Sequence, residues 1–336
     1  MSLAEEFEWF ADWCVGTSPL YEKLARGVAD DPYLLSLAEE IPPKRGTPNI
    51  LFAAVHWHLL GGVSHPLADF YPSVTDDPKT ADPFPAFREF CAEHEDELLP
   101  LLRNRRTQTN AVRRCTALFP AFSHISNEVG GEPLALVELG PSGGLNLCWD
   151  RYVYDYGDAG RYGTGECVLD TKIRSERSPP LPDEFPRVAS RIGIDLNPLD
   201  VRDETDARWL RALVWPEHED RHRLLRGATN VARQHPPELR QGDAVEELPD
   251  VLAGIPSDVP VCVFDTQMRY QLPETAQDRL RVRIEAAAEG RPLHWLSGHE
   301  SADEWEGAFA LNWFDGEEYR RLLAYEQHGK WLRWVR

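Results

Sequence analysis

The amino-acid sequence predicts an α/β protein in which a mostly parallel sheet follows an all-helical N-terminal domain. Up to about residue 130, apolar residues recur at three- and four-residue spacing, as they do in amphipathic helices. Further along, short apolar runs bounded by turn residues alternate with helical stretches, which is typical of βαβ units. The last segment carries aromatic, alternating runs between D-G and H-G turns, which predicts antiparallel strands at the sheet edge.

The helical domain is expected over residues 1–130. Its helical segments include AEEFEWFADWCV, NILFAAVHWHLLGG and FPAFREFCAEHEDELLPLLRNR. Stretches that contain Pro and Gly, such as IPPKRGTP, separate these segments. Since no alternating strand pattern occurs here, the whole domain is expected to be helical.

The α/β domain is expected over residues 131–336. Insertions at about 152–186 and 201–234 interrupt its alternation of strands and helices. The first is expected to begin with a hairpin rich in Tyr and Gly, and the second to form two helices broken at Trp215–Pro216. The predicted parallel strands are PLALVEL (133–139), RVASRIGIDL (187–196), PELRQGD (237–243), VPVCVFD (259–265) and RPLHWLS (291–297).

The composition argues against several classes of function. The net charge is −20, with 56 acidic and 36 basic residues, so a broad nucleic-acid-binding face is not expected. The many acidic residues and few lysines predict a protein adapted to a salty, halophilic cytoplasm. No apolar run approaches the roughly 18 residues of a membrane helix, and no secretory signal is visible, so a cytoplasmic location is expected.

No metal site is expected either. The six cysteines are scattered and never form C-x-x-C, so we predict reduced thiols rather than a zinc ribbon or disulfides. His56 and His58 would lie on different sides of a helix, and no H-E-x-x-H motif occurs.

The stretch ELGPSGGLN (138–146) can be interpreted in two ways. It contains G-x-S-x-G between a predicted strand and a helical stretch, as at the nucleophile of an α/β-hydrolase. Ser142 would then attack a substrate, with Asp265 and either His294 or His299 completing a triad. However, a hydrolase nucleophile follows several strands, whereas PLALVEL is the first strand predicted here.

The other reading is a loop that holds a cofactor. Gly140 and Gly144 would let a ligand approach the backbone at the start of a helix. Successive predicted strands end near acidic residues, and such strand ends line the ligand-binding edge of an open α/β sheet. An acidic edge repels a pyrophosphate and suits a cationic sulfonium. The acidic residues are Glu138, Asp195, Asp243 and Asp265.

These segments resemble the motifs of class I S-adenosylmethionine-dependent methyltransferases. E-L-G-P-S-G-G resembles the first motif, G-I-D-L-N the second and G-D-A the third. The resemblance implies a Rossmann-like sheet, with Asp195 on the ribose and Asp243 and Ala244 beside the adenine. This sequence differs from the methyltransferase motifs in two places. Ser142 stands where the first motif usually has its middle glycine, and D-T-Q-M-R-Y follows the fourth strand, so methylation of base amino groups is not indicated. The implied cofactor-binding residues are Glu138, Gly140, Ser142, Gly144, Asn146, Asp195, Asn197, Asp243 and Ala244.

A resemblance over nearly the whole chain is to the bacterial and archaeal family numbered 2332 among the domains of unknown function. The motifs that carry it include SPLYEKLA, RRTQTNAVRRC, RIGIDLNPLDV, RWLRALVWPEHEDR and QHGKWLRW. It implies a shared ligand pocket, and Arg106, Gln108 and Asn110 in the second motif are candidate substrate-binding residues.

Three residues near the fourth and fifth strands are candidate catalytic groups: Tyr270, His299 and Asp265. The leading hypothesis is methyl transfer from S-adenosylmethionine to an unidentified small-molecule or protein acceptor. The alternatives are a Ser142 hydrolase and a non-catalytic ligand-binding or scaffold protein on the same fold. No oligomeric state is predicted.

Overall fold

The computed structural model describes residues 1–302, 304–305 and 307–336. Contacts between Cα atoms divide the chain into two compact units. The helical unit consists of Met1–Thr109 and Arg202–Arg226, and the sheet unit of Asn110–Val201 and Gly227–Arg336. None of the helices described is long and apolar enough to span a membrane.

The helical unit has an aromatic core. Tyr21, Phe7 and Phe10 are buried and lie near the ring of Phe52 in α4. α4 is buried along most of its length, and Nδ1 of His56 lies 3.0 Å from the carbonyl oxygen of Ala212 at the end of α8. The helices are α1 (Leu3–Cys14), α2 (Pro19–Ala29), α3 (Pro32–Ala38), α4 (Thr47–Leu60), η1 (Pro66–Phe70), α5 (Phe84–Glu93), α6 (Glu95–Asn104), α8 (Glu204–Ala212) and the first part of α9 (Glu219–Gln234).

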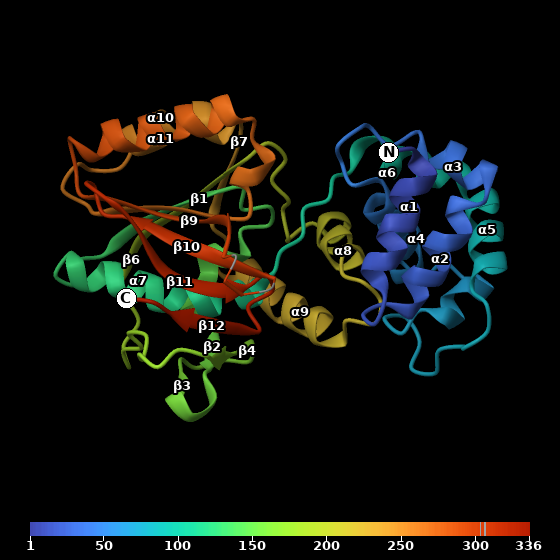
Figure 1. Cartoon of the computed structure of the whole chain (residues 1–336), viewed down its shortest axis with the longest axis horizontal. Coiled ribbons are helices and arrows are strands. Elements are labelled where there is room, and N and C mark those ends of the chain that lie inside the picture. The colour runs from blue at the N-terminus through green and yellow to red at the C-terminus, as the bar shows by residue number, and fades with distance from the viewer. Residues whose placement is uncertain (303, 306) are drawn as a thin grey trace. The chain divides into compact units, whose positions relative to one another are not determined.

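The sheet unit is built on a nine-stranded sheet in the order β5-β12-β11-β10-β9-β8-β1-β6-β7 (Figure 1). The five strands from β9 to β7 are parallel, and β10, β11 and β12 follow as an antiparallel meander. The strands are β1 (Leu134–Leu139), β5 (Lys172–Ile173), β6 (Val188–Asp195), β7 (Glu238–Gln241), β8 (Val261–Thr266), β9 (Leu293–Ser301), β10 (Ala308–Phe314), β11 (Tyr319–Glu326) and β12 (Trp331–Trp334).

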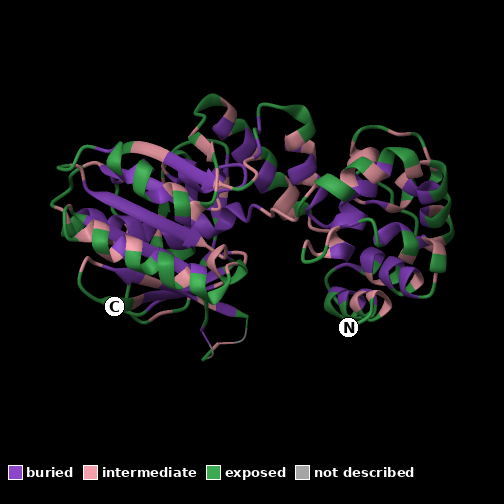
Figure 2. Ribbon diagram, turned by 90° about the horizontal axis from the view of Figure 1, so that it is seen from above, coloured by how far each residue is buried: buried purple, intermediate pink, exposed green. Residues whose placement is uncertain are grey.

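Helices cover both faces of this sheet. α10 (Ala244–Ala253) and α11 (Glu274–Ala288) lie over one face, where Val137, Val263 and Leu280 belong to one hydrophobic core (Figure 1). α7 (Cys115–Glu128) covers the other face, where the rings of Phe122 and Phe264 are 5.3 Å apart. The central strands are accordingly buried along most of their length (Figure 2).

The first predicted insertion forms a small second sheet in the order β3-β2-β4. β2 (Val153–Asp155) pairs antiparallel with β3 (Arg161–Tyr162), as expected of the predicted hairpin, and parallel with β4 (Val168–Asp170). The second insertion forms α8 and α9 on either side of Trp215–Pro216. The α/β class, the mostly parallel sheet, the antiparallel C-terminal strands and the N-terminal helices are therefore confirmed.

β1 is the point at which the order of the strands reverses, because β6 lies on one side of it and β8 on the other. In open α/β sheets, ligands bind in the crevice outside the carboxyl ends of the strands at such a point.

Candidate functional site

The four predicted acidic residues come from neighbouring parallel strands at this carboxyl edge. Glu138 lies near the end of β1, Asp195 is the last residue of β6, Asp243 follows β7 by two residues, and Asp265 lies near the end of β8. The prediction of an acidic edge thus agrees with the order β7-β6-β1-β8.

The glycine loop after β1 is held by the end of β6. The backbone N–H of Gly140 donates to the carbonyl of Ile194 at 2.9 Å. The N–H of Ser142 donates to Oδ2 of Asp195 at 2.9 Å, and the N–H of Asn197 donates to Oδ1 of the same carboxylate at 2.8 Å. Asp195 therefore organises the loop that the sequence assigned to cofactor binding.

The loop glycines are required by the packing of the protein itself. Gly140 has φ +72°, and a Cβ atom there would lie 2.4 Å from Cγ of Met268. Gly144 has φ +71°, and its Cβ would lie 2.7 Å from Cγ of Pro237. Glycine is needed at these two positions because a larger residue would clash with the protein's own side chains. This reason differs from the predicted one, the close approach of a ligand.

Glu138 is buried at the end of β1, with 1% of its surface exposed. Its Oε1 accepts a hydrogen bond from Nδ2 of Asn146 at 2.9 Å, and its Oε2 has no hydrogen-bond partner among the described residues. Burial raises the pKa of Glu138 to about 8; Asp195 and Asp265 raise it further, and Asn146 and Arg114 oppose the shift. At neutral pH this carboxyl group is therefore mostly protonated.

Arg114 in η2 (Val112–Arg114) belongs to the same site, and sequence reasoning missed it. Its guanidinium donates to the carbonyl of Thr266 at 3.2 Å, to Oε1 of Gln267 at 2.7 Å and to the carbonyl of Gln327 at 2.8 Å. Gln267 has φ +64°, a strained conformation for a residue other than glycine, and such strain clusters at functional sites. Burial lowers the pKa of Arg114. The one feature of the sequence that could have pointed to Arg114 is the R-R-C at the end of the family motif RRTQTNAVRRC.

Asp265 is fully buried, but it lies on the other face of the sheet from Glu138. Glu138 is in register with Phe264, so the next residue along β8 points the opposite way. Nε1 of Trp295 donates to Oδ2 of Asp265 at 3.1 Å. Burial raises the pKa of Asp265 to about 6, while hydrogen bonds from Ser297 and Trp295 and the charge of Arg269 oppose the shift.

His299 and Tyr270, the two other candidate catalytic residues, have different surroundings. Nδ1 of His299 lies 3.0 Å from Oγ of Ser297, and burial lowers the pKa of His299 to about 4. Tyr270 lies in η5 (Arg269–Gln271), and 60% of its surface is exposed.

Asp243 serves as the N-cap of α10. Its Oδ1 accepts hydrogen bonds from the backbone N–H of Val245 at 2.8 Å and of Glu246 at 3.3 Å. Ala244 is the first residue of that helix and packs against the core.

The three candidate substrate-binding residues fall on both sides of a unit boundary. Arg106 and Gln108 belong to the helical unit, where Nε1 of Trp209 donates to the carbonyl of Arg106 at 3.0 Å. Asn110 begins the sheet unit, where it is buried. Its Nδ2 has no hydrogen-bond partner in the part of the chain that the structure describes.

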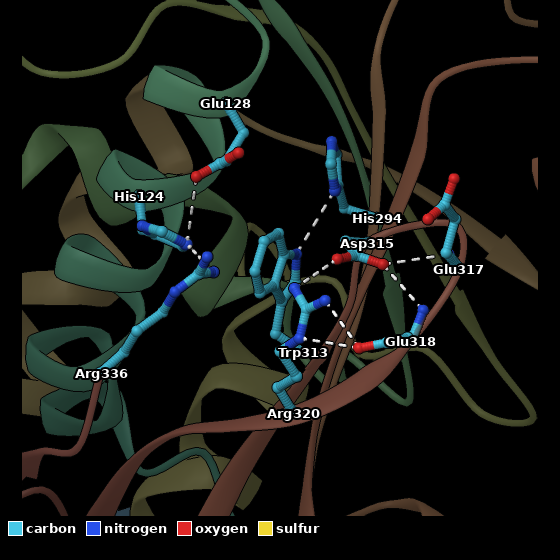
Figure 3. Close-up of polar contacts among 9 residues, drawn as sticks. All are labelled: His124, Glu128, His294, Trp313, Asp315, Glu317, Glu318, Arg320 and Arg336. Carbon is cyan, nitrogen blue, oxygen red and sulfur yellow. Dashed lines mark hydrogen bonds and ion pairs between the residues drawn. The ribbon is translucent and has the colours of Figure 1, made fainter.

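His294, one of the two histidines considered for a Ser142 triad, is the second residue of β9 and lies at the amino end of this parallel strand. Its Nδ1 accepts a hydrogen bond from Nε1 of Trp313 at 3.3 Å (Figure 3). In the same cluster, His124 of α7 lies 2.7 Å from a guanidinium nitrogen of Arg336. Because Ser142 follows the carboxyl end of β1, His294 does not serve it as a base.

Among residues 1–302, 304–305 and 307–336, no group of His, Cys, Asp and Glu side chains could hold a metal ion. All six cysteines are free and buried, and burial raises the pKa of their thiols.

The fold and the site define an α/β protein with an open, mostly parallel sheet and an acidic carboxyl edge. Residues 4–334 match the family model described as an uncharacterized protein conserved in bacteria (DUF2332). Since the match covers nearly the whole chain, the protein belongs to this family, as the sequence motifs predicted. Comparison with curated proteins gave no match, and comparison with solved structures gave none either.

Proposed function

We propose that the protein binds S-adenosylmethionine at the carboxyl edge of β1 and β6 and transfers the methyl group to a small-molecule or protein acceptor. The observation that carries the proposal is the buried carboxyl group of Glu138, one oxygen of which has no hydrogen-bond partner among the described residues. A buried polar atom without a partner is costly, so such an oxygen suits a ligand that donates to it.

The residues of this edge fit a cationic nucleoside. Glu138 and Asp195 lie on the same face, since Glu138 is in register with Gly193, two residues before Asp195. Glu138 would hold a cationic group of the ligand and Asp195 its ribose hydroxyls, while Asn146 keeps Glu138 in place. The backbone N–H of Ser142 and of Asn197 orient Asp195 for this role. When bound, the cofactor supplies an electrophilic methyl group on a sulfonium.

The first test is thermal unfolding in molar KCl with and without S-adenosylmethionine or its demethylated product. A ligand at 100 times its dissociation constant adds about 2.7 kcal/mol to the free energy of unfolding, which raises the unfolding temperature by several degrees. Asp195→Ala should abolish the shift. Ser142→Ala is the matched control, because it keeps the backbone N–H that donates to Asp195. No shift of the wild-type protein at millimolar ligand would refute the proposal.

A second candidate function, hydrolysis by Ser142, is favoured by one observation. Ser142 has φ +53°, and a strained serine between a strand and a helix is typical of a hydrolase nucleophile. A fluorophosphonate that labels the wild-type protein but not Ser142→Ala would support the hydrolase. If the protein neither becomes labelled nor responds to the cofactor, the third alternative applies, a non-catalytic ligand-binding or scaffold protein.

A further inference from the structure

Arg114 is a buried cation that has no counter-ion in the part of the chain that the structure describes. Only 8% of its surface is exposed. Its guanidinium donates to two backbone carbonyls and one side-chain amide oxygen, and all three acceptors are uncharged. Arg113, the neighbouring buried arginine, forms an ion pair with Asp170 at 3.1 Å. Because a charge is costly to remove from water, arginines are rarely buried without an opposite charge, so Arg114 is suited to an anionic ligand.

Hydrogen-bond donors are in excess around Arg114. A guanidinium has five N–H groups, and the three hydrogen bonds of Arg114 leave one N–H on Nη1 and one on Nη2. Gln267 accepts from Arg114 through Oε1 at 2.7 Å, and its Nε2 is buried without a hydrogen-bond partner among the described residues. Since Oε1 and Nε2 are bonded to the same carbon, this amide donor lies beside the guanidinium. A carboxylate suits such donors, because it only accepts hydrogen bonds.

These donors lie on the face of the sheet that carries Glu138. Cys115 directly follows Arg114, and its Sγ donates to Oδ1 of Asn146 at 3.4 Å. Nδ2 of Asn146 donates to Glu138 at 2.9 Å and to Oγ1 of Thr266 at 3.4 Å. Asn146 therefore connects the buried carboxyl group of Glu138 with the end of β8 and with the residue next to Arg114.

Arg114 lies on the side of Glu138 that is away from the proposed ribose site. Its partners lie at the end of β8, directly after β8 and directly after β11, whereas Asp195 ends β6. β8 and β6 are on opposite sides of β1. A nucleoside that reaches from Asp195 to Glu138 therefore leaves Arg114 for the second substrate. Gln267 is only partly buried, and Tyr270 further along the same segment is exposed, so this segment borders the surface.

We propose that Arg114, together with the side-chain amide of Gln267, binds a carboxylate group of the methyl acceptor. The acceptor is then a small organic acid. A phosphate is less suitable than a carboxylate, because its second negative charge is repelled by the acidic residues of the same edge. The assignment of the carboxylate to the acceptor rests on the proposed function.

The carboxylate site is tested without the cofactor, by thermal unfolding of the full-length protein with acetate as the probe. Potassium acetate replaces part of the KCl at constant ionic strength, so that the screening of the net charge is unchanged. Acetate at about ten times its dissociation constant should raise the unfolding temperature by about 2 °C. Gln267→Glu should abolish this rise, because the new carboxylate neutralises Arg114 within the protein. Gln234→Glu, which adds the same charge at an exposed position, is the matched control and should respond as the wild-type protein does. No rise in the wild-type protein, or an equal rise in Gln267→Glu, would overturn the inference.

Adding S-adenosylmethionine to the same experiment separates this inference from the proposed function. If the carboxylate belongs to the acceptor, saturating cofactor should leave the effect of acetate unchanged. Loss of the acetate effect would show that the carboxylate of the cofactor itself occupies Arg114, and would overturn the assignment to the acceptor. A cofactor shift without any acetate effect would overturn the carboxylate site alone. An acetate effect without any cofactor shift would support the carboxylate site and overturn methyl transfer.

Discussion

Glu138 combines full burial with a polar atom that lacks a partner. Its raised pKa means that it takes up a proton in the folded protein at pH values where the same residue in an unfolded chain is ionised. A cationic ligand would reverse this shift and release the proton. Binding of such a ligand should therefore tighten as the pH rises toward 8.

The same carboxyl group should affect the stability of the protein itself. Between the ordinary pKa of 4.5 and the folded value of about 8, the folded state binds more protons than the unfolded state. The contribution of Glu138 to the free energy of unfolding must then fall as the pH rises, by roughly 1 kcal/mol per pH unit. Glu138→Gln should remove this dependence.

The measurement is urea unfolding between pH 6.5 and 8. This window lies above the pKa of Asp265, about 6. His56, His222 and His299, whose pKa values are lowered from 6.5 in the folded protein, still take up protons in the unfolded chain near pH 6.5, but they do so equally in the wild-type protein and in Glu138→Gln, so their effect cancels from the difference between the two. Glu132→Gln is the control, because Glu132 is exposed just before β1. Equal slopes for the wild-type protein and Glu138→Gln would contradict the assignment of the buried proton.

At the scale of elements, the loop after β1 is held from both sides. Asp195 of β6 binds its backbone, and Met268, beyond the end of β8, fills the space beside Gly140. The loop therefore depends on the ends of both strands that neighbour β1.

Gly140→Ala should be more destabilising than a glycine substitution elsewhere with the same backbone conformation. Gly131→Ala is the matched control, since Gly131 has φ +77° and no atom lies within 4 Å of its added Cβ. The control should cost about 1 kcal/mol for the left-handed conformation, and Gly140→Ala should cost more because Met268 must move. Thermal unfolding measures both, and equal losses would show that Met268 adapts freely.

Much of this edge could be predicted from the sequence, because apolar runs followed by turns locate strand ends. Glu138, Asp195, Asp243 and Asp265 were found in this way. Periodicity did not reveal that Asp265 faces away from Glu138, because this depends on the register of β8 against β1. Nor did it reveal that Asp243 caps α10.

Other members of the site depend on long-range pairing that no local pattern encodes. Arg114 binds residues more than 150 positions away along the chain. The irregular register beside His299 arises from the pairing of β9 with β10. The positive φ of Gln267 is also invisible in the sequence, because glutamine rarely adopts it.

At the scale of the whole molecule, the main electrostatic feature is the net charge of −20. Repulsion between acidic groups destabilises the folded state at low ionic strength. At about 1 M salt the Debye length is roughly 3 Å, so most of this repulsion is screened.

Unfolding temperatures in KCl should therefore rise by several degrees between about 0.1 M and 1 M salt. Sucrose at equal osmolality is the control, since it is excluded from protein surfaces but does not screen charge. If sucrose raised the unfolding temperature as much as KCl does, screening would not be the cause.

The helical unit is not continuous in the sequence. α8 forms only when residues up to Ala212 have been made, and until then the carbonyl partner of His56 in α4 does not exist. By that time the ribosome has already produced β1 through β6 of the other unit. The first 109 residues therefore lack the packing of α8 until translation has passed Ala212. A nascent chain that stalls before Arg202 would expose α4 to chaperones and proteases.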